Sequence, residues 1–296
     1  MKKLQLLVLA VLLLAMPATA QEAPLRLRLD GGAGFVNGVE LALREVNARG
    51  GIAGRQVVIV PSGGDLVLEP GIFADATSPL GRYVAGKLQA KSVAIAARSM
   101  DGMRVAPMGA TALIVEPQQV DFSATVIRAK QSGADALIVG ALPSDETVRL
   151  LTELHKQGFT RPIVGEPALV SARLIERAGE AANGLRSVMG LNAETPMPAI
   201  RDFQRKHEAV YGGRSGLDAM RGYSAVYLLK AVAAKPGRID NAGFREALKN
   251  LSLSAADEPG LLLDVTGDAT GALRHQLIVV EVRNKQAVAI DTLSPQ

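Results

Sequence analysis

The sequence predicts an α/β protein with mostly parallel sheets flanked by helices. Three observations carry this prediction. Segments with strand patterns alternate with segments of helical periodicity along nearly all of the chain after residue 20. The apolar run at Ala134–Gly140 is typical of a strand buried on both faces. Apolar residues make up 48% of the chain, enough for a large core although there is no cysteine to form disulfides.

The N-terminal segment has the pattern of an export signal. Lys2 and Lys3 precede an apolar run from Leu4 to Met16, and Ala18-Thr19-Ala20 follows as a cleavage site. The run is too short to span a bilayer, which takes about 20 residues. We therefore expect residues 1–20 to be a cleaved signal peptide and the mature protein to be exported.

The first folding unit begins with a predicted strand at Leu25–Leu29, where apolar and basic residues alternate. A helix follows, and Gly50 and Gly51 end it. Its apolar face consists of Phe35, Val39, Ala42, Leu43 and Val46. Gln56–Val60 is a predicted strand, and the glycines and prolines of residues 61–70 predict a loop.

The remaining elements follow from the same patterns. Helices are expected at 80–88, 122–132, 145–157, 169–178, 198–211, 217–234 and 240–250. Strands are expected at 92–97, 111–115, 134–140, 162–164 and 184–189, and, at hairpin spacing, at 260–264, 276–282 and 287–291.

The residues that enzymes use are scarce. The only histidines, His155, His207 and His275, are far apart and lack metal-ligand spacing, and there is neither cysteine nor a G-x-S-x-G elbow. We therefore expect that the protein is not an enzyme and that it binds neither a metal nor a cofactor. The formal net charge is +4, half of it from the two signal-peptide lysines, so nucleic acid is not expected as a partner.

Two near-motifs leave alternatives. Gly32 and Gly34 open a dinucleotide-type G-x-G-x-x-G pattern, but Asn37 replaces its last glycine, so a nucleotide-dependent enzyme is a weak alternative. Asp264–Gly271 has the carboxylate density of a calcium loop, but His275 stands where a bidentate glutamate is needed. A turn between two strands is the preferred interpretation there.

Several segments, in order along the chain, resemble the type I periplasmic substrate-binding proteins of branched-chain amino acid ABC transporters. They include NGVELA at 37–42, EVNARGGIAGR at 45–55, GADALIVG at 133–140, GEPAL at 165–169 and GYSAV at 222–226. The resemblance implies two α/β lobes that close about a hinge on a branched-chain or related small amino acid. It also implies a monomer whose closed form docks on a membrane ABC permease.

The resemblance implies a first lobe formed by residues 22–73 and 195–255, and a second formed by residues 74–194 and 256–296. The first lobe is expected to be shortened. Only twelve residues separate Val60 from Phe73, where the family carries further βα units with the serine and threonine that grip the ligand. A second segment that is shorter than in the family lies between Gly102 and Gly109, where the family has a whole helix. We call it the second shortfall.

Four residues are candidates for ligand binding. Glu166 matches the family position whose carboxylate pairs with the ligand ammonium, and Asp101 and Asp218 fall where the family has tyrosines. Ser99 ends a predicted parallel strand, where such sheets bind ligands. Leu142 and Pro143 stand where an aromatic is common. Because the first-lobe contacts are missing, a ligand sensor or interaction module that has lost the amino acid site is the alternative function.

Overall fold

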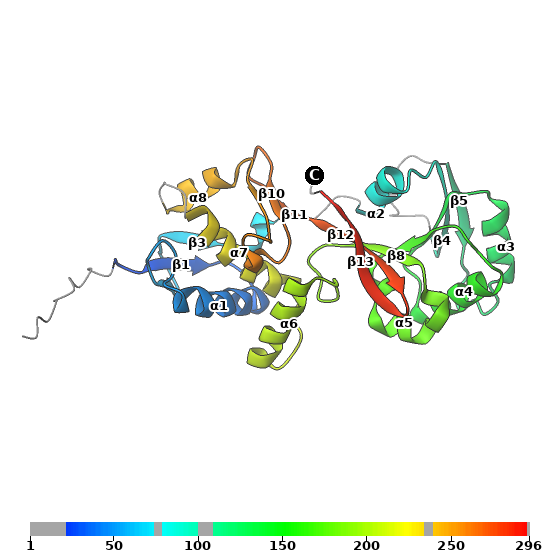
Figure 1. Ribbon diagram of the computed structural model, residues 1–296, viewed down its shortest axis with the longest axis horizontal. Coiled ribbons are helices and arrows are strands. Elements are labelled where there is room, and N and C mark those ends of the chain that lie inside the picture. Colours follow the sequence, from blue (N-terminus) through cyan, green and yellow to red (C-terminus); the bar gives the residue numbers. More distant parts are fainter. Residues whose placement is uncertain (1–21, 74–78, 100–108, 234–238, 295–296) are drawn as a thin grey trace, which may run out of the picture.

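The computed structural model describes residues 22–73, 79–99, 109–233 and 239–294. Two α/β lobes follow one another along the long axis of the molecule (Figure 1). We call the lobe with β1, β2, β3, β9, β10 and β11 the first lobe, and the lobe with the seven-stranded sheet the second lobe. Parallel pairing and flanking helices confirm the predicted fold class.

The first lobe is built on a small parallel sheet in the order β2-β1-β3. The strands are β1 (Leu25–Leu29), β2 (Val57–Ile59) and β3 (Leu66–Leu68). The prediction that residues 61–70 form only a loop is therefore wrong. Leu66 and Leu68 are fully buried and β3 pairs with β1, so tertiary contacts override the local turn signals.

The chain crosses from one side of β1 to the other within a few residues. Ile59 of β2 and Leu66 of β3 both pair with Leu27, so β2 uses the first half of β1 and β3 the second half. No helical return is needed, unlike the usual connection of parallel strands. Gly64 (φ 100°) permits the crossing, since a Cβ there would lie 3.1 Å from the Arg26 carbonyl oxygen.

Two helices pack closely beside this sheet. They are α1 (Ala33–Ala48) and α7 (Leu217–Ala233). A Cβ on Gly38 would lie 1.9 Å from the Ala219 carbonyl oxygen, and one on Gly222 would lie 2.2 Å from that of Phe35. The whole predicted apolar face of α1 is buried. Helix α6 (Pro198–Tyr211) packs on both helices through Phe203 and Tyr211, and α8 (Asn241–Leu248) follows.

The first part of the C-terminal tail forms an antiparallel sheet of β9 (Ser252–Leu253), β10 (Val265–Gly267) and β11 (Leu273–His275). The predicted strand at 260–264 is wrong, because Pro259–Leu261 forms a 3-10 turn and Gly260 lies against the Tyr227 ring. The β10–β11 turn is closed by Asp268, whose carboxylate accepts hydrogen bonds from Thr270 and Ala272.

The sheet of the second lobe has the order β13-β12-β8-β7-β6-β4-β5. Strands β4 to β8 are parallel, and β12 and β13 continue the sheet antiparallel. The strands are β4 (Ser92–Ala97), β5 (Gly109–Ile114), β6 (Ala136–Val139), β7 (Ile163–Gly165), β8 (Leu185–Met189), β12 (Leu277–Arg283) and β13 (Gln286–Leu293).

The central strands of this sheet, such as β4 and β6, are buried on both faces. Residues on one face of β4, such as Ala94, pack with the core that includes helices α3 (Ser123–Gln131), α4 (Ser144–Lys156) and α5 (Ala172–Ala178). Residues on the other face, such as Val93, pack with the segment of α2 (Pro79–Arg82) and the π-helical residues 83–87. The predicted helix at 169–178 is split at Ser171, whose hydroxyl accepts a hydrogen bond from the Leu174 N–H and caps α5.

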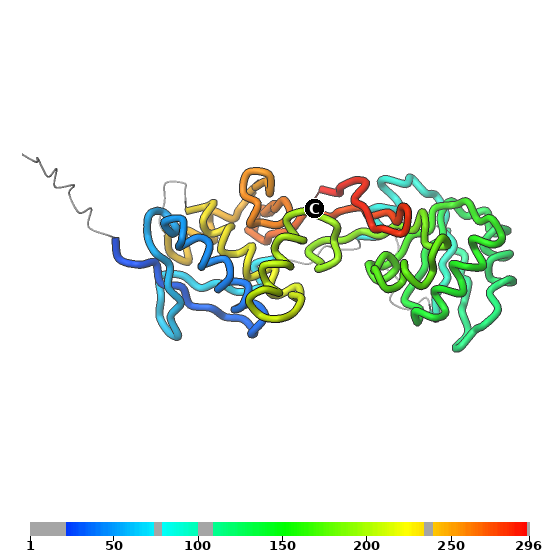
Figure 2. The backbone as a smooth tube through the Cα atoms, turned by 60° about the horizontal axis from the view of Figure 1, so that its bottom comes forward, coloured from blue at the N-terminus to red at the C-terminus, as the bar shows by residue number. Residues whose placement is uncertain are grey.

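Two described connections run between the lobes, and Figure 2 shows the narrow waist that they cross. One is the loop from β8 to α6, and the other is the direct passage from β11 to β12 at His275–Leu277. The tail is therefore divided between the lobes at Gln276.

Candidate functional site

A cavity of about 280 Å³ lies between the lobes, beside these connections. The second lobe lines it with residues near the ends of β7 and β8, and the first lobe with residues of α7 and β11. The lining consists of Phe73, Pro79, Glu166, Pro167, Val188, Gly190, Leu191, Asn192, Leu217, Arg221, Arg274, His275 and Leu277.

Glu166 reaches this cavity from the second lobe. It directly follows β7 and precedes the 3-10 turn Pro167–Val170, and its side chain is exposed. Gly165 permits the tight exit from the strand, because a Cβ there would lie 2.7 Å from both the Leu169 side chain and the Val139 carbonyl oxygen. Glu166 also lines an adjoining cavity of about 170 Å³ together with Leu142.

The first-lobe wall of the cavity is basic. Arg221 comes from the second turn of α7, and Arg274 and His275 end β11. His275 stacks on Phe73 with ring centroids 4.5 Å apart. Arg274 Nη1 lies 3.2 Å from the Asp268 carboxylate, whereas its Nε is buried without a partner, as is His275 Nε2.

The electrostatics of this wall keep His275 neutral. Burial of the imidazole, with a smaller effect of the Arg221 charge, lowers the pKa of His275 to about 3. Because the protonated form of a buried imidazole loses its hydration, the ring is uncharged near neutral pH. The wall thus carries two guanidinium charges and a neutral imidazole.

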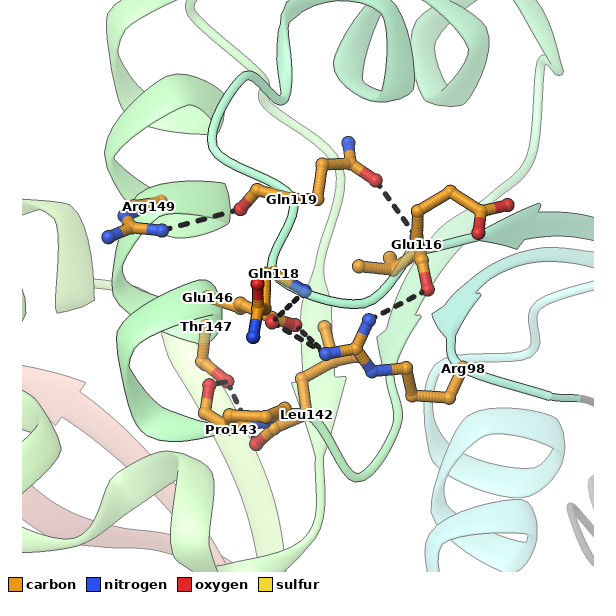
Figure 3. Close-up of polar contacts among 10 residues, drawn as sticks. Arg98, Glu116, Gln118, Gln119, Leu142, Pro143, Glu146, Thr147 and Arg149 are labelled. Carbon is orange, nitrogen blue, oxygen red and sulfur yellow. Dashed lines mark hydrogen bonds and ion pairs between the residues drawn. The ribbon is translucent and has the colours of Figure 1, made fainter.

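A second polar cluster lies at the point where the strand order of the second lobe reverses, between β4 and β6. Arg98 follows β4, and its Nη2 lies 2.5 and 2.6 Å from the two carboxylate oxygens of Glu146 on α4 (Figure 3). Glu146 also accepts a hydrogen bond from the Gln118 N–H, and Arg98 donates to the Val115 carbonyl. These contacts hold the loop after β5 against the start of α4, so the crevice that such a reversal creates is bridged by the protein itself.

The structure separates the four candidates for ligand binding. Glu166 lines the interlobe cavity, whereas Asp218 is exposed in the first turn of α7, between the cavity residues Leu217 and Arg221. Ser99 is exposed next to Arg98 and is not part of the cavity lining. Asp101 lies outside the described residues. The second shortfall, between Gly102 and Gly109, lies largely outside them as well.

The glycines near the start of α1 have a packing role. Gly38 lies against α7, so the close approach that it permits is between two helices and not toward a pyrophosphate. Across residues 22–73, 79–99, 109–233 and 239–294, no group of three acidic or histidine side chains is suited to hold a metal. Within those ranges, too, every helix is too short or too polar to cross a membrane.

The comparison with protein families decides the class of protein. The family model described as periplasmic binding protein matches residues 73–287. This chain belongs to that family. It is therefore a binding protein and not an enzyme, as the sequence predicts, and the resemblance to periplasmic binding proteins is confirmed. A comparison with curated proteins gives no match.

Solved structures of binding proteins share the fold of this family member. A protein from Rhodospirillum rubrum, assigned to branched-chain amino acid ABC transport, superposes with a TM-score of 0.67 at 20% identity, over 90% of this chain and 99% of its own. A branched-chain amino acid ABC transporter periplasmic ligand-binding protein from Burkholderia xenovorans gives a TM-score of 0.62 at 16% identity, over 92% and 96%.

The third structure is the closed conformation of a leucine-, isoleucine-, valine-, threonine- and alanine-binding protein from Brucella ovis. Its TM-score is 0.56 at 14% identity, over 92% of this chain and 95% of its own.

Sequence reasoning missed the basic wall of the cavity. Arg221, Arg274 and His275 belong to no motif, and the first two lie 53 positions apart along the chain. The one available signal in the sequence is that His275 lies two positions before an apolar strand. That this position is a crossing between the lobes is known only from the tertiary structure.

Proposed function

We propose that this binding protein captures a small amino acid or a related solute between its lobes and delivers it, in a closed form, to a membrane ABC permease. The observation that carries the proposal is a cavity that residues of both lobes line at the chain crossings. A ligand that contacts both walls stabilises the closed state over the open one. We further propose that the protein is an exported monomer, released into the periplasm after cleavage of residues 1–20.

The division of the chain into lobes is part of this proposal. Of the described residues, we assign 22–73, 195–233 and 239–275 to the first lobe, and 79–99, 109–194 and 276–294 to the second. Residues 259–275 pack on α7 and α8, as when Ser224 Oγ donates to the Leu261 carbonyl and Asn250 N–H donates to that of Asp268. Strands β12 and β13 pair with β8.

Glu166 is the proposed second-lobe contact for a ligand ammonium. Substituting Glu166→Gln keeps the size of the side chain and removes its charge. A charge-assisted hydrogen bond contributes about 1.5–3 kcal/mol, so the affinity for an α-amino acid should fall at least about tenfold. Isothermal calorimetry with the panel of leucine, isoleucine, valine, threonine and alanine measures this, with the exposed Glu176→Gln on α5 as a matched control. Equal affinities of wild type and Glu166→Gln would reject the assignment.

A ligand sensor or interaction module is the second candidate. It is favoured by one observation: among the described residues that line the cavity there is no serine or threonine. Residues 61–70 instead cross the sheet and form β3. If none of the five amino acids gives heat or raises the melting temperature, this second candidate replaces amino acid transport.

A further inference from the structure

The basic first-lobe wall is the feature of the cavity that the proposed function leaves unexplained. Resting on that function, we propose that Arg221, Arg274 and His275 bind the carboxylate of the ligand, in place of a hydroxyl-lined first-lobe site. The ligand class is a small carboxylate that also carries a hydrogen-bond donor for Glu166.

The first argument is the presence of buried nitrogens without partners. Arg274 Nε and His275 Nε2 have no hydrogen-bond partner, and both residues line the cavity. Leaving a buried polar group unsatisfied costs about 1–3 kcal/mol. An oxygen acceptor in the cavity would relieve this cost for Arg274 Nε, and for His275 in the tautomer that carries its proton on Nε2.

The second argument is the charge of the wall. Arg221 and Arg274 are cations, and no other arginine or lysine lines the cavity among the described residues. A guanidinium presents its N–H groups in a planar fork that matches a carboxylate. Because His275 is neutral, it can donate a hydrogen bond near the two guanidinium groups without adding a third positive charge.

The third argument is the arrangement across the cavity. The basic residues come from α7 and β11 of the first lobe, whereas Glu166 follows β7 of the second. A ligand that carries both a carboxylate and a hydrogen-bond donor would therefore contact both lobes. The remaining lining is largely apolar, for example Leu191 and Leu217, and a volume of about 280 Å³ suits a small solute.

Three probes and a variant set test this inference. The probes are leucine, leucinamide, which lacks the carboxylate, and 4-methyl-2-oxopentanoate, which lacks the ammonium. Binding of each to the full chain is measured by calorimetry for wild type, Arg221→Gln, Arg274→Gln and Arg274→Lys. Arg245→Gln on α8, exposed and outside the cavity lining, is the control that removes the same charge from the same lobe.

We expect leucine to bind wild type and Arg245→Gln equally. Leucinamide, which lacks the carboxylate, and the 2-oxo acid, which lacks the donor for Glu166, should each bind at least about tenfold more weakly. Each glutamine variant should lose about 10- to 100-fold in affinity, as expected for a charge-assisted pair of about 1.5–3 kcal/mol. Because Arg274 also bonds to Asp268, Arg274→Gln can lower stability, and circular dichroism checks its folding. If Arg274→Gln is destabilised, the test relies on Arg221→Gln. Arg274→Lys should bind leucine more tightly than Arg274→Gln does, because it keeps the positive charge.

The outcomes separate this inference from the proposed function. Equal affinity of wild type and Arg221→Gln, or binding of leucinamide as tight as that of leucine, overturns the carboxylate site and leaves the capture function standing. Arginine-dependent binding without a decrease of the radius of gyration in small-angle scattering supports the site and rejects hinge closure. No binding of leucine or of any other amino acid of the panel to wild type overturns both.

Discussion

The two lobes reach the same layered architecture with sheets of very different size. The second lobe orders five parallel strands, β4 to β8, and adds two antiparallel strands. The first lobe has a three-stranded parallel sheet in which β2 and β3 each pair with part of β1. Close packing of α1 against α7 through Gly38 and Gly222 accompanies this small sheet. The comparison teaches that a shortened α/β lobe can rely on helix contacts where sheet area is lacking.

Two polar clusters, one in each lobe, also differ in how completely their atoms are hydrogen-bonded. In the second lobe, the carboxylate of Glu146 is bonded to Arg98 and to the Gln118 N–H. In the first lobe, Arg274 Nε and His275 Nε2 have no partner. A cluster whose polar atoms have hydrogen-bond partners within the protein stabilises a loop. A cluster that faces a cavity with atoms lacking such partners is suited to bind a ligand.

The largest expected effect concerns the helix pair of the first lobe. In Gly38→Ala, the new methyl group would overlap the Ala219 carbonyl oxygen, which belongs to the backbone and cannot rotate away. We expect a loss of about 3–5 kcal/mol in the free energy of unfolding, because α1 and α7 must separate. Urea denaturation followed by circular dichroism measures this.

The control for this substitution lies in the second lobe. Gly86→Ala adds a methyl group to the π-helical segment, where a Cβ meets nothing within 4 Å. Its stability should change by less than about 1 kcal/mol. If Gly38→Ala is as mild as Gly86→Ala, the first lobe does not depend on the α1–α7 contact.

An intermediate effect on stability is expected at the hydrogen-bonded cluster of Arg98 and Glu146 in the second lobe. Glu146→Ala leaves Arg98, which is 29% exposed, and the Gln118 N–H without their partner. We expect a loss of about 2–3 kcal/mol, below the 3–5 kcal/mol typical of fully buried pairs, because Arg98 retains contact with water.

Its neighbour Asp145 provides the matched control. Asp145 pairs with Arg177 at the surface, with a side chain that is 67% exposed, so Asp145→Ala should cost about 1 kcal/mol or less. Chemical denaturation of both variants tests the difference. Similar losses for the two substitutions would show that burial does not distinguish the pairs.

The smallest effect is a pH dependence that arises at the first-lobe wall. The pKa of His275 is about 3 in the folded protein and about 6.5 for an unperturbed histidine, so the unfolded state binds the proton first as the pH falls. Stability is therefore lost as the pH decreases from about 6.5 toward 3, by about 1–2 kcal/mol between pH 7 and pH 5.

The variant His275→Gln should lack this part of the loss. Carboxylates with lowered pKa values, such as Glu281, act at lower pH, since their unfolded values lie near 4. Thermal melts at pH 7, 6 and 5 compare the two proteins. Parallel pH profiles for wild type and His275→Gln would contradict the neutral, buried state of this imidazole.

Most elements were predictable from local patterns, because helical and strand periodicity record which face is buried. The face of α1 from Phe35 to Val46 and the buried strand at β6 are examples. The errors have a common physical cause. Leu66–Leu68 lies among turn-forming residues, and it becomes a strand because it pairs with the edge of β1. Residues 262–264 are not a strand, because they follow a 3-10 turn in which Gly260 packs on Tyr227. In both places a contact with a distant part of the chain overrides the local pattern.

The amino-acid sequence by itself determined the fold class, the family and the position of Glu166 directly after a strand, because these depend on residue order and short-range periodicity. Only the tertiary structure decided that Glu166 shares a cavity with Arg221, Arg274 and His275, and that Arg98 is neutralised by Glu146. Such groups meet through chain crossings between separate sheets, and no local pattern along the chain records which distant side chains a crossing brings together.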